Sequence, residues 1–204
     1  GLTTGQAGSL VTWTLVGAVI GGFIFGTLSD KFGRVRVLTW TIVLFAVFTG
    51  LCAFAQGYWD LLIYRTIAGI GLGGEFGIGM ALAAEAWPAQ HRAKATSYVA
   101  IGWQLGVLAA ALLTPVLLPY IGWRGMFMVG IIPAFVAWFF RAKLHEPEIF
   151  VQSKEIKEHS HTNSFKLLVK DVRTTKTSIG VAILTSVQNF GYYGIMIWLP
   201  NFLS

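Results

Sequence analysis

Long apolar segments alternate with short polar ones along most of the chain. Segments of about twenty predominantly apolar residues, enough to cross a bilayer as a helix, recur along its length. They cover residues 9–29, 38–56, 61–86, 96–119, 122–142 and 177–199. None alternates strictly between apolar and polar positions, which argues against barrel strands, whereas helices satisfy their backbone hydrogen bonds internally. The pattern predicts an all-α membrane protein with six transmembrane helices.

Composition agrees with a lipid environment. Charged residues make up 12 % of the chain and apolar residues 55 %, whereas about a quarter of a soluble domain is charged. Residues 1–9 lack both the basic start and the short apolar core of a cleavable signal, so we expect none. The single Cys52 lies inside a predicted helix, so no disulfide can form within the chain.

Positive charge indicates the orientation. Thirteen of the 15 Lys and Arg residues fall in three polar regions, 31–36, 92–94 and 141–176. By the positive-inside rule these regions face the cytoplasm, which places Gly1 outside. The net charge of +6 is therefore mostly a topology signal, and we expect a multi-pass protein of the cell membrane that binds no nucleic acid.

The loop after the first apolar segment carries a family resemblance. GTLSDKFGRVRVL, residues 26–38, resembles the signature loop between helices two and three of the major facilitator superfamily. It departs from that signature at Val35, where the family usually has another basic residue. Further matches are the R-x-x-x-G-x-G pattern of helix four (Arg65, Gly69, Gly71), E-x-W-P-x-x-x-R-A (Glu85 to Ala93), and the acidic Pro motif HEPE at 145–148, as in sugar-porter-like and metabolite-symporter members.

The resemblance implies an organisation for the whole chain. It identifies the six segments as helices two to seven of twelve, so that the chain is a fragment with one helix missing before residue 1. Residues 1–143 would then form the N-terminal bundle (family helices two to six), 144–176 the cytoplasmic central loop, and 177–204 the first helix of the C-terminal bundle. Within 144–176, apolar and basic residues alternate from Phe165 to Arg173, which favours a short helix on the cytoplasmic surface, and a disordered linker is the alternative.

The resemblance also implies a cytoplasmic gate. Asp30 would hold the other six-helix bundle while the carrier is open to the outside, and Arg34, Glu85 and Arg92 would form a neighbouring charge network. The alternative for the basic residues of this loop is ordinary topology. Asp30 needs a partner in either case, because a carboxylate at the C-terminal end of a helix meets the negative end of the helix dipole.

Two ionisable residues lie within one apolar segment. Glu75 is near its middle and Arg65 is ten residues earlier, about 15 Å away along a helix. Ionisable groups inside a membrane usually mark transport pathways. We therefore interpret Glu75 as the proton-coupling residue and Arg65 as a substrate-anion contact, or as a modulator of that proton. The alternative is that both are neutralised in fixed interhelical hydrogen bonds.

Further polar side chains could bind a polar metabolite or hold helices together. They are Gln104, Gln188, Asn189, Tyr192 and Tyr193, and the last four form two pairs one helical turn apart. The segment from Asn189 to Pro200 resembles the seventh helix of metabolite and carboxylate symporters. Small-xxx-small glycine pairs, such as Gly17 with Gly21, predict close helix crossings.

These residues predict a secondary active transporter. The expected activity is import of a small polar metabolite, an organic anion or sugar-like acid, by proton symport through alternating access. Alternatives are a proton-coupled efflux antiporter, an uncoupled facilitator and a non-transporting sensor on the same fold. No nucleophile with a base and no metal-binding cluster is visible in the helices, so we expect no enzyme, no cofactor and no metal site. The expected functional unit is a monomer.

Overall fold

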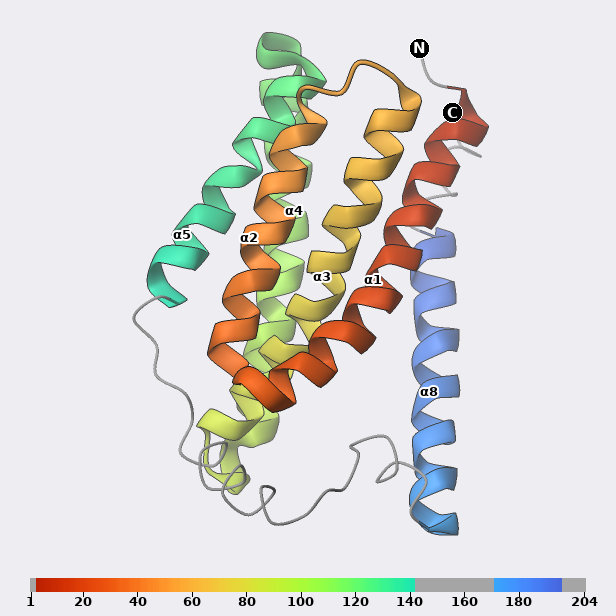
Figure 1. Ribbon diagram of the computed structural model, residues 1–204, viewed down its shortest axis with the longest axis vertical. Helices are drawn as coiled ribbons and strands as arrows, with labels where there is room; N and C mark the ends of the chain where they lie inside the picture. The colour runs from red at the N-terminus through yellow and green to blue at the C-terminus, as the bar shows by residue number, and fades with distance from the viewer. Residues whose placement is uncertain (1–2, 142–170, 196–204) are drawn as a thin grey trace. The chain divides into compact units, whose positions relative to one another are not determined.

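The computed structural model describes residues 3–141 and 171–195. The chain divides into two units, Gly1–Lys154 and Glu155–Ser204, which are considered separately. The first unit contains α1 (Thr4–Phe32), α2 (Arg34–Cys52), α3 (Tyr58–Ala86), the 3-10 turn η1 (Ala89–His91), α4 (Arg92–Val129) and α5 (Ile131–Arg141), and the second contains α8 (Val172–Tyr193). Successive helices of the first unit alternate in direction (Figure 1).

Local sequence signals set the helix ends. Thr3 and Gln6 form a capping box at the start of α1, in which each side chain accepts a hydrogen bond from the other backbone N–H. In the first turn of α3, the Asp60 carboxylate accepts a hydrogen bond at 3.1 Å from the N–H of Gln56, which precedes the helix. At the other end, α3 stops before Trp87, whose extended backbone is the conformation favoured ahead of a proline.

The first three predicted segments correspond to α1, α2 and α3, but several predicted ends were wrong. The second segment was expected to start at residue 38, whereas α2 begins at Arg34 because only Gly33 separates it from α1. Gly33 has φ 109° and ψ 148°, a conformation that side chains with a Cβ avoid. One glycine therefore replaces the longer loop that the charges suggested.

The next two predicted segments meet at a second special glycine. Gly122 has φ 64° and ψ 178° and breaks the helical run assigned to α4. Within the described residues, four stretches are long and apolar enough to cross a membrane: Gly5–Phe32, Arg34–Cys52, Tyr58–Ala86 and Ala89–Phe140. The last has 52 residues, far more than one crossing needs. The break at Gly122 falls where the predicted segments 96–119 and 122–142 meet, while the count of six membrane helices stays a prediction.

Helix α3 is the centre of the bundle and contacts α1, α2 and α4. Its crossing with α1 depends on glycines from both helices. A Cβ on Gly21 would overlap the Ile70 carbonyl oxygen, and a Cβ on Gly73 would overlap that of Ala18. Gly17 and Gly69 are equally tight against Thr66 and Thr14. The predicted close crossing is therefore present. Because these glycines have no side chains, the backbones of the two helices come into contact.

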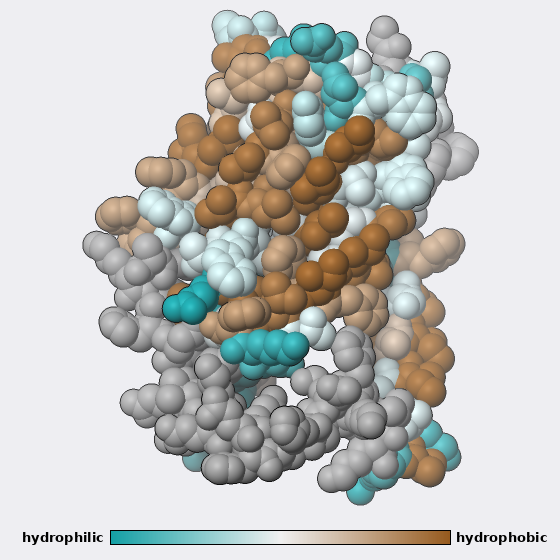
Figure 2. Space-filling view, in the orientation of Figure 1, coloured by the Kyte–Doolittle hydropathy of each residue, from teal (hydrophilic) through white to brown (hydrophobic). Residues whose placement is uncertain are grey.

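The outside of the bundle is apolar. Figure 2 shows hydrophobic residues across the middle of one face of the first unit, with hydrophilic residues nearer its ends. Phe23, Val47 and Leu112 are among the large apolar side chains that remain exposed. Such continuous apolar exposure suits lipid or further helices and not water.

Candidate functional site

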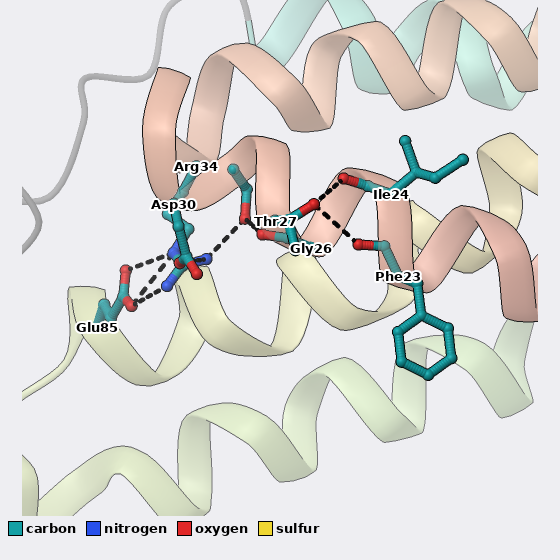
Figure 3. A network of polar contacts seen from close by, with 8 residues as sticks. Phe23, Ile24, Gly26, Thr27, Asp30, Arg34 and Glu85 are labelled. Carbon is teal, nitrogen blue, oxygen red and sulfur yellow. Dashed lines mark hydrogen bonds and ion pairs between the residues drawn. The ribbon is translucent and has the colours of Figure 1, made fainter. Parts of the chain in front are cut away.

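The Arg34 side chain joins the ends of three helices. Its guanidinium forms an ion pair with Asp30 at 2.9 Å and another with Glu85 at 3.1 Å. The Nε–H also points at the Glu85 carboxylate, 3.2 Å from Oε2. Asp30 is in the last turn of α1, Arg34 begins α2, and Glu85 is in the last turn of α3. Figure 3 shows the guanidinium between the two carboxylates.

Ser29 completes this cluster, and sequence reasoning missed it. Its hydroxyl accepts a hydrogen bond from Arg34 Nη1 at 2.6 Å and donates one to the Gly26 carbonyl at 2.8 Å. Ser29 is fully buried, whereas the side chain of Arg34 is 17 % exposed. A serine directly before the acid, at the end of an apolar run, was the available signal. The cluster links three helix ends and keeps part of its surface accessible to solvent.

Arg92 lies apart from the predicted charge network. It is exposed, and its Nε–H donates to the Trp87 carbonyl at 3.3 Å, across the turn between α3 and α4. The structure thus brings together three of the four predicted gate residues, Asp30, Arg34 and Glu85. Arg92 instead stabilises the start of its own helix.

Arg65 is half-buried in the third turn of α3. Its guanidinium carbon lies 5.6 Å from the centre of the Phe127 ring, within the range of a cation–π contact. Phe127 also packs against the buried cluster formed by Leu10, Cys52, Ala55 and Leu61. Sequence reasoning identified Arg65 but not Phe127, because a phenylalanine in an apolar segment gives no signal of its own.

Glu75 is half-buried in the middle of α3 and has an interaction with another residue. Its neighbours along the helix are packed on both sides. A Cβ on Gly74 would lie 2.7 Å from Phe25 and 2.8 Å from Thr41, and the Phe76 ring meets Trp103 of α4 edge-on at 5.8 Å. Gly74 is therefore tightly packed against α1 and α2, while Phe76 contacts α4 and remains exposed.

Gln104 is exposed on α4, in a shallow groove along that helix. Apolar residues make up the rest of the groove: Ala100, Ile101, Leu105 and Leu108. An amide in such a setting supplies both donors and acceptors. It can therefore bind a polar molecule or a polar group of another helix.

The polar residues predicted at the end of the chain lie on α8, in the second unit. Asn189 donates its side-chain N–H to the Thr185 carbonyl at 2.9 Å, and the rings of Tyr192 and Tyr193 meet edge-on at 5.4 Å. Gln188 is exposed. Helix α8 begins at an Asp171 cap, whose carboxylate accepts from the Thr174 N–H. The HEPE motif at 145–148, most of the predicted loop at 144–176 and the end of the segment at 177–199 lie outside the described residues.

Comparison with known proteins decides the family. The model of the Major Facilitator Superfamily matches residues 1–204. The chain belongs to this superfamily. Membership of this superfamily, together with the long apolar helices, indicates that the chain is part of a multi-pass membrane protein. Its relatives are named as transporters, which indicates that the protein is not an enzyme.

Relatives of this superfamily chain are named as transporters. It is 77 % identical to a Haemophilus influenzae protein whose name assigns it to metabolite transport, covering all of this chain and 51 % of that protein. It is 34 % identical to the cis,cis-muconate transport protein of Acinetobacter baylyi, covering 99 % of this chain and 50 % of that one. More distant relatives are named for niacin, gentisate and benzoate. The chain thus spans about half the length of the relatives it matches.

Solved structures give the same fold. The inward-open xylose transporter of Escherichia coli matches with a TM-score of 0.65 and 23 % identity, over 91 % of this chain and 48 % of that one. At this identity the match concerns the fold. It supports the arrangement of helices seen in the first unit.

Proposed function

We propose that the full-length protein is a secondary active transporter that imports a small organic anion together with protons by alternating access. The observation that carries the proposal is that Arg65 and Glu75 both lie in α3, an apolar helix of a superfamily chain. Names of relatives support the substrate class, since muconate, niacin, gentisate and benzoate are all organic acids.

Arg65 is the proposed contact for the substrate carboxylate. A guanidinium presents its N–H donors in a planar fork that matches a carboxylate. Gln104 on α4, with Gln188, Asn189, Tyr192 and Tyr193 on α8, are the proposed hydrogen-bonding groups for the rest of the substrate. Both types of group are needed, because charge selects an acid and hydrogen bonds distinguish one acid from another.

Glu75 is the proposed proton carrier. We expect Glu75→Gln to lose uphill uptake driven by a pH gradient while it retains exchange between substrate pools, since exchange requires no net proton movement. The measurement is uptake of labelled muconate, gentisate and benzoate by the full-length protein in proteoliposomes, with and without an imposed pH gradient. Xylose serves as the test of a sugar substrate.

Asp60→Asn is the matched control, because this carboxylate is on the same helix but lies in its first turn, where it accepts from the Gln56 N–H. A Glu75→Gln protein that still concentrates substrate under the pH gradient would contradict proton coupling through this residue. If protons drive the substrate outward, the protein is an antiporter. Uptake that does not depend on pH would indicate a facilitator, and binding without transport would indicate a sensor.

The cluster of Asp30, Arg34 and Glu85 is the proposed cytoplasmic gate, and Arg92 contributes to it only through the turn between α3 and α4. In this proposal residues 31–36 and 92–94 face the cytoplasm, and the protein resides in the cell membrane and acts as a monomer. The proposed organisation keeps residues 1–143 as the N-terminal bundle, 144–176 as the central loop and 177–204 as the start of a C-terminal bundle. The full-length protein would then have twelve membrane helices.

A further inference from the structure

Two aromatic rings meet in the helical stretch directly after Gly122. The helical run resumes after this glycine, and Trp123 and Phe127 are four residues apart on the same helix face. Their ring centres are 6.2 Å apart and their planes meet at 90°, an edge-to-face arrangement. The two rings therefore form one continuous aromatic unit.

Each ring of this unit holds one guanidinium. Arg124 lies 4.3 Å from the centre of the Trp123 ring, and Arg65 lies 5.6 Å from the centre of the Phe127 ring. Both distances are within the range of a cation–π contact. We call Arg124, Trp123, Phe127 and Arg65, in this order of contact, the aromatic bridge.

The far end of the aromatic bridge is anchored to backbone. Arg124 Nη2 donates a hydrogen bond to the Ala55 carbonyl at 3.0 Å, in the connection between α2 and α3. Phe127 is held a second time, because it packs on the buried cluster that includes Ala55 and Leu61. The position of the Phe127 ring is thus fixed from two sides.

A ring contact leaves the hydrogen-bonding capacity of Arg65 available. Within residues 3–141 and 171–195, the Arg65 guanidinium has no hydrogen bond and no ion pair. The ring attracts the cation through its negative face and occupies none of the in-plane N–H donors. A cation held in this way can still bind a carboxylate through two N–H groups.

We propose that Phe127 is a positioning residue for Arg65, which it holds in the orientation that receives the substrate carboxylate. This inference rests on the proposed function, in which Arg65 binds an organic anion. Arg124 contributes through Trp123 and the anchor at Ala55. An aromatic side chain at position 127 then sets the affinity for the acid and has little effect on turnover.

The test uses the full-length protein in proteoliposomes, with muconate, gentisate and benzoate as probes. Phe127→Leu keeps the apolar volume but removes the ring. We expect it to raise KM for the transported acid about three- to thirtyfold, the range that a cation–π contact supplies, with turnover changed less than about twofold. Phe127→Tyr retains a ring and should restore a KM near the wild-type value. Phe135→Leu, which alters an exposed phenylalanine of α5, should leave KM unchanged.

Arg65→Gln separates the inference from the proposed function. If Arg65→Gln leaves KM unchanged for every probe, or if the wild type transports none of them, the proposed substrate contact is wrong and the inference is overturned with it. If Arg65→Gln raises KM but Phe127→Leu does not, or if Tyr fails to restore it, only the positioning role is overturned. In the Arg65→Gln background, Phe127→Leu should add no further increase in KM.

Discussion

Asp30 and Glu85 depend on the same guanidinium. Each carboxylate is in the last turn of its helix, where the dipole is unfavourable to negative charge. Arg34 compensates for both, and its contacts are charge-assisted and shielded from most solvent. Because Glu85 receives contacts from two nitrogens of Arg34, loss of Asp30 alone should loosen the cluster without dismantling it.

Asp30→Asn should therefore affect movement more than binding. If the cluster is the cytoplasmic gate, removing this charge destabilises the outward-open state by ~1.5 kcal/mol relative to the other states of the cycle. The carrier then returns to that state less readily, and turnover should fall about tenfold with KM little changed. The measurement is initial uptake rate against substrate concentration for the full-length protein. Lys31→Gln is the control, since this exposed neighbour also removes one charge. Equal turnover in Asp30→Asn and wild type would reject the gate.

The crossing of α1 and α3 shows what a missing side chain contributes. Gly21 and Gly73 allow the two backbones to touch, whereas a Cβ on Gly26 of α1 or Gly77 of α3 would point into open space. The same residue type is thus indispensable at one position and replaceable at another in the same helix. Dispersion contacts along the crossing replace the hydrophobic driving force that is absent in lipid.

Gly21→Ala should lower the thermal stability of the detergent-solubilised full-length protein. The new methyl group overlaps the Ile70 carbonyl, so the helices must separate, at a cost of about 1–3 kcal/mol. Gly26→Ala should be neutral or stabilising, because alanine has the higher helix propensity and the site is open. The apparent Tm of both variants decides the matter, and equal shifts would contradict the close crossing.

Helix positions were more predictable than helix contacts. The apolar segments located α1 to α3 to within about five residues, and the boundary between segments 96–119 and 122–142 falls next to the break at Gly122. Phe127 could not be identified as a member of a site, because Arg65 is 62 residues away and meets it only through folding. For Ser29 the only signal was its position directly before Asp30. The apolar pattern of a sequence indicates which residues are buried. It does not indicate which helix faces contact one another, and a binding site depends on those contacts.

The two ends of the bundle are held by different chemistry. At one end Arg34 pairs with carboxylates, and at the other Arg124 uses a ring and a backbone carbonyl. Breaking the first requires separation or neutralisation of charge, while the contacts of Arg124 with the described residues include no carboxylate. If the charged end faces the cytoplasm, then the side that opens during transport can respond to its charges while the opposite corner of this bundle stays fixed.

Cysteine labelling tests this orientation. Lys31, in the last turn of α1, and Gln56, in the connection between α2 and α3, are exposed and flank α2 at its two ends, and Cys52 is buried. In a full-length Cys52→Ala protein, with any cysteine outside this chain also replaced, a membrane-impermeant maleimide added to intact cells should label Gln56→Cys but not Lys31→Cys. After the membrane is permeabilised, both should react. The reverse pattern in intact cells would show that the basic loop faces outward, so that Arg34 and its carboxylates could not form the cytoplasmic gate.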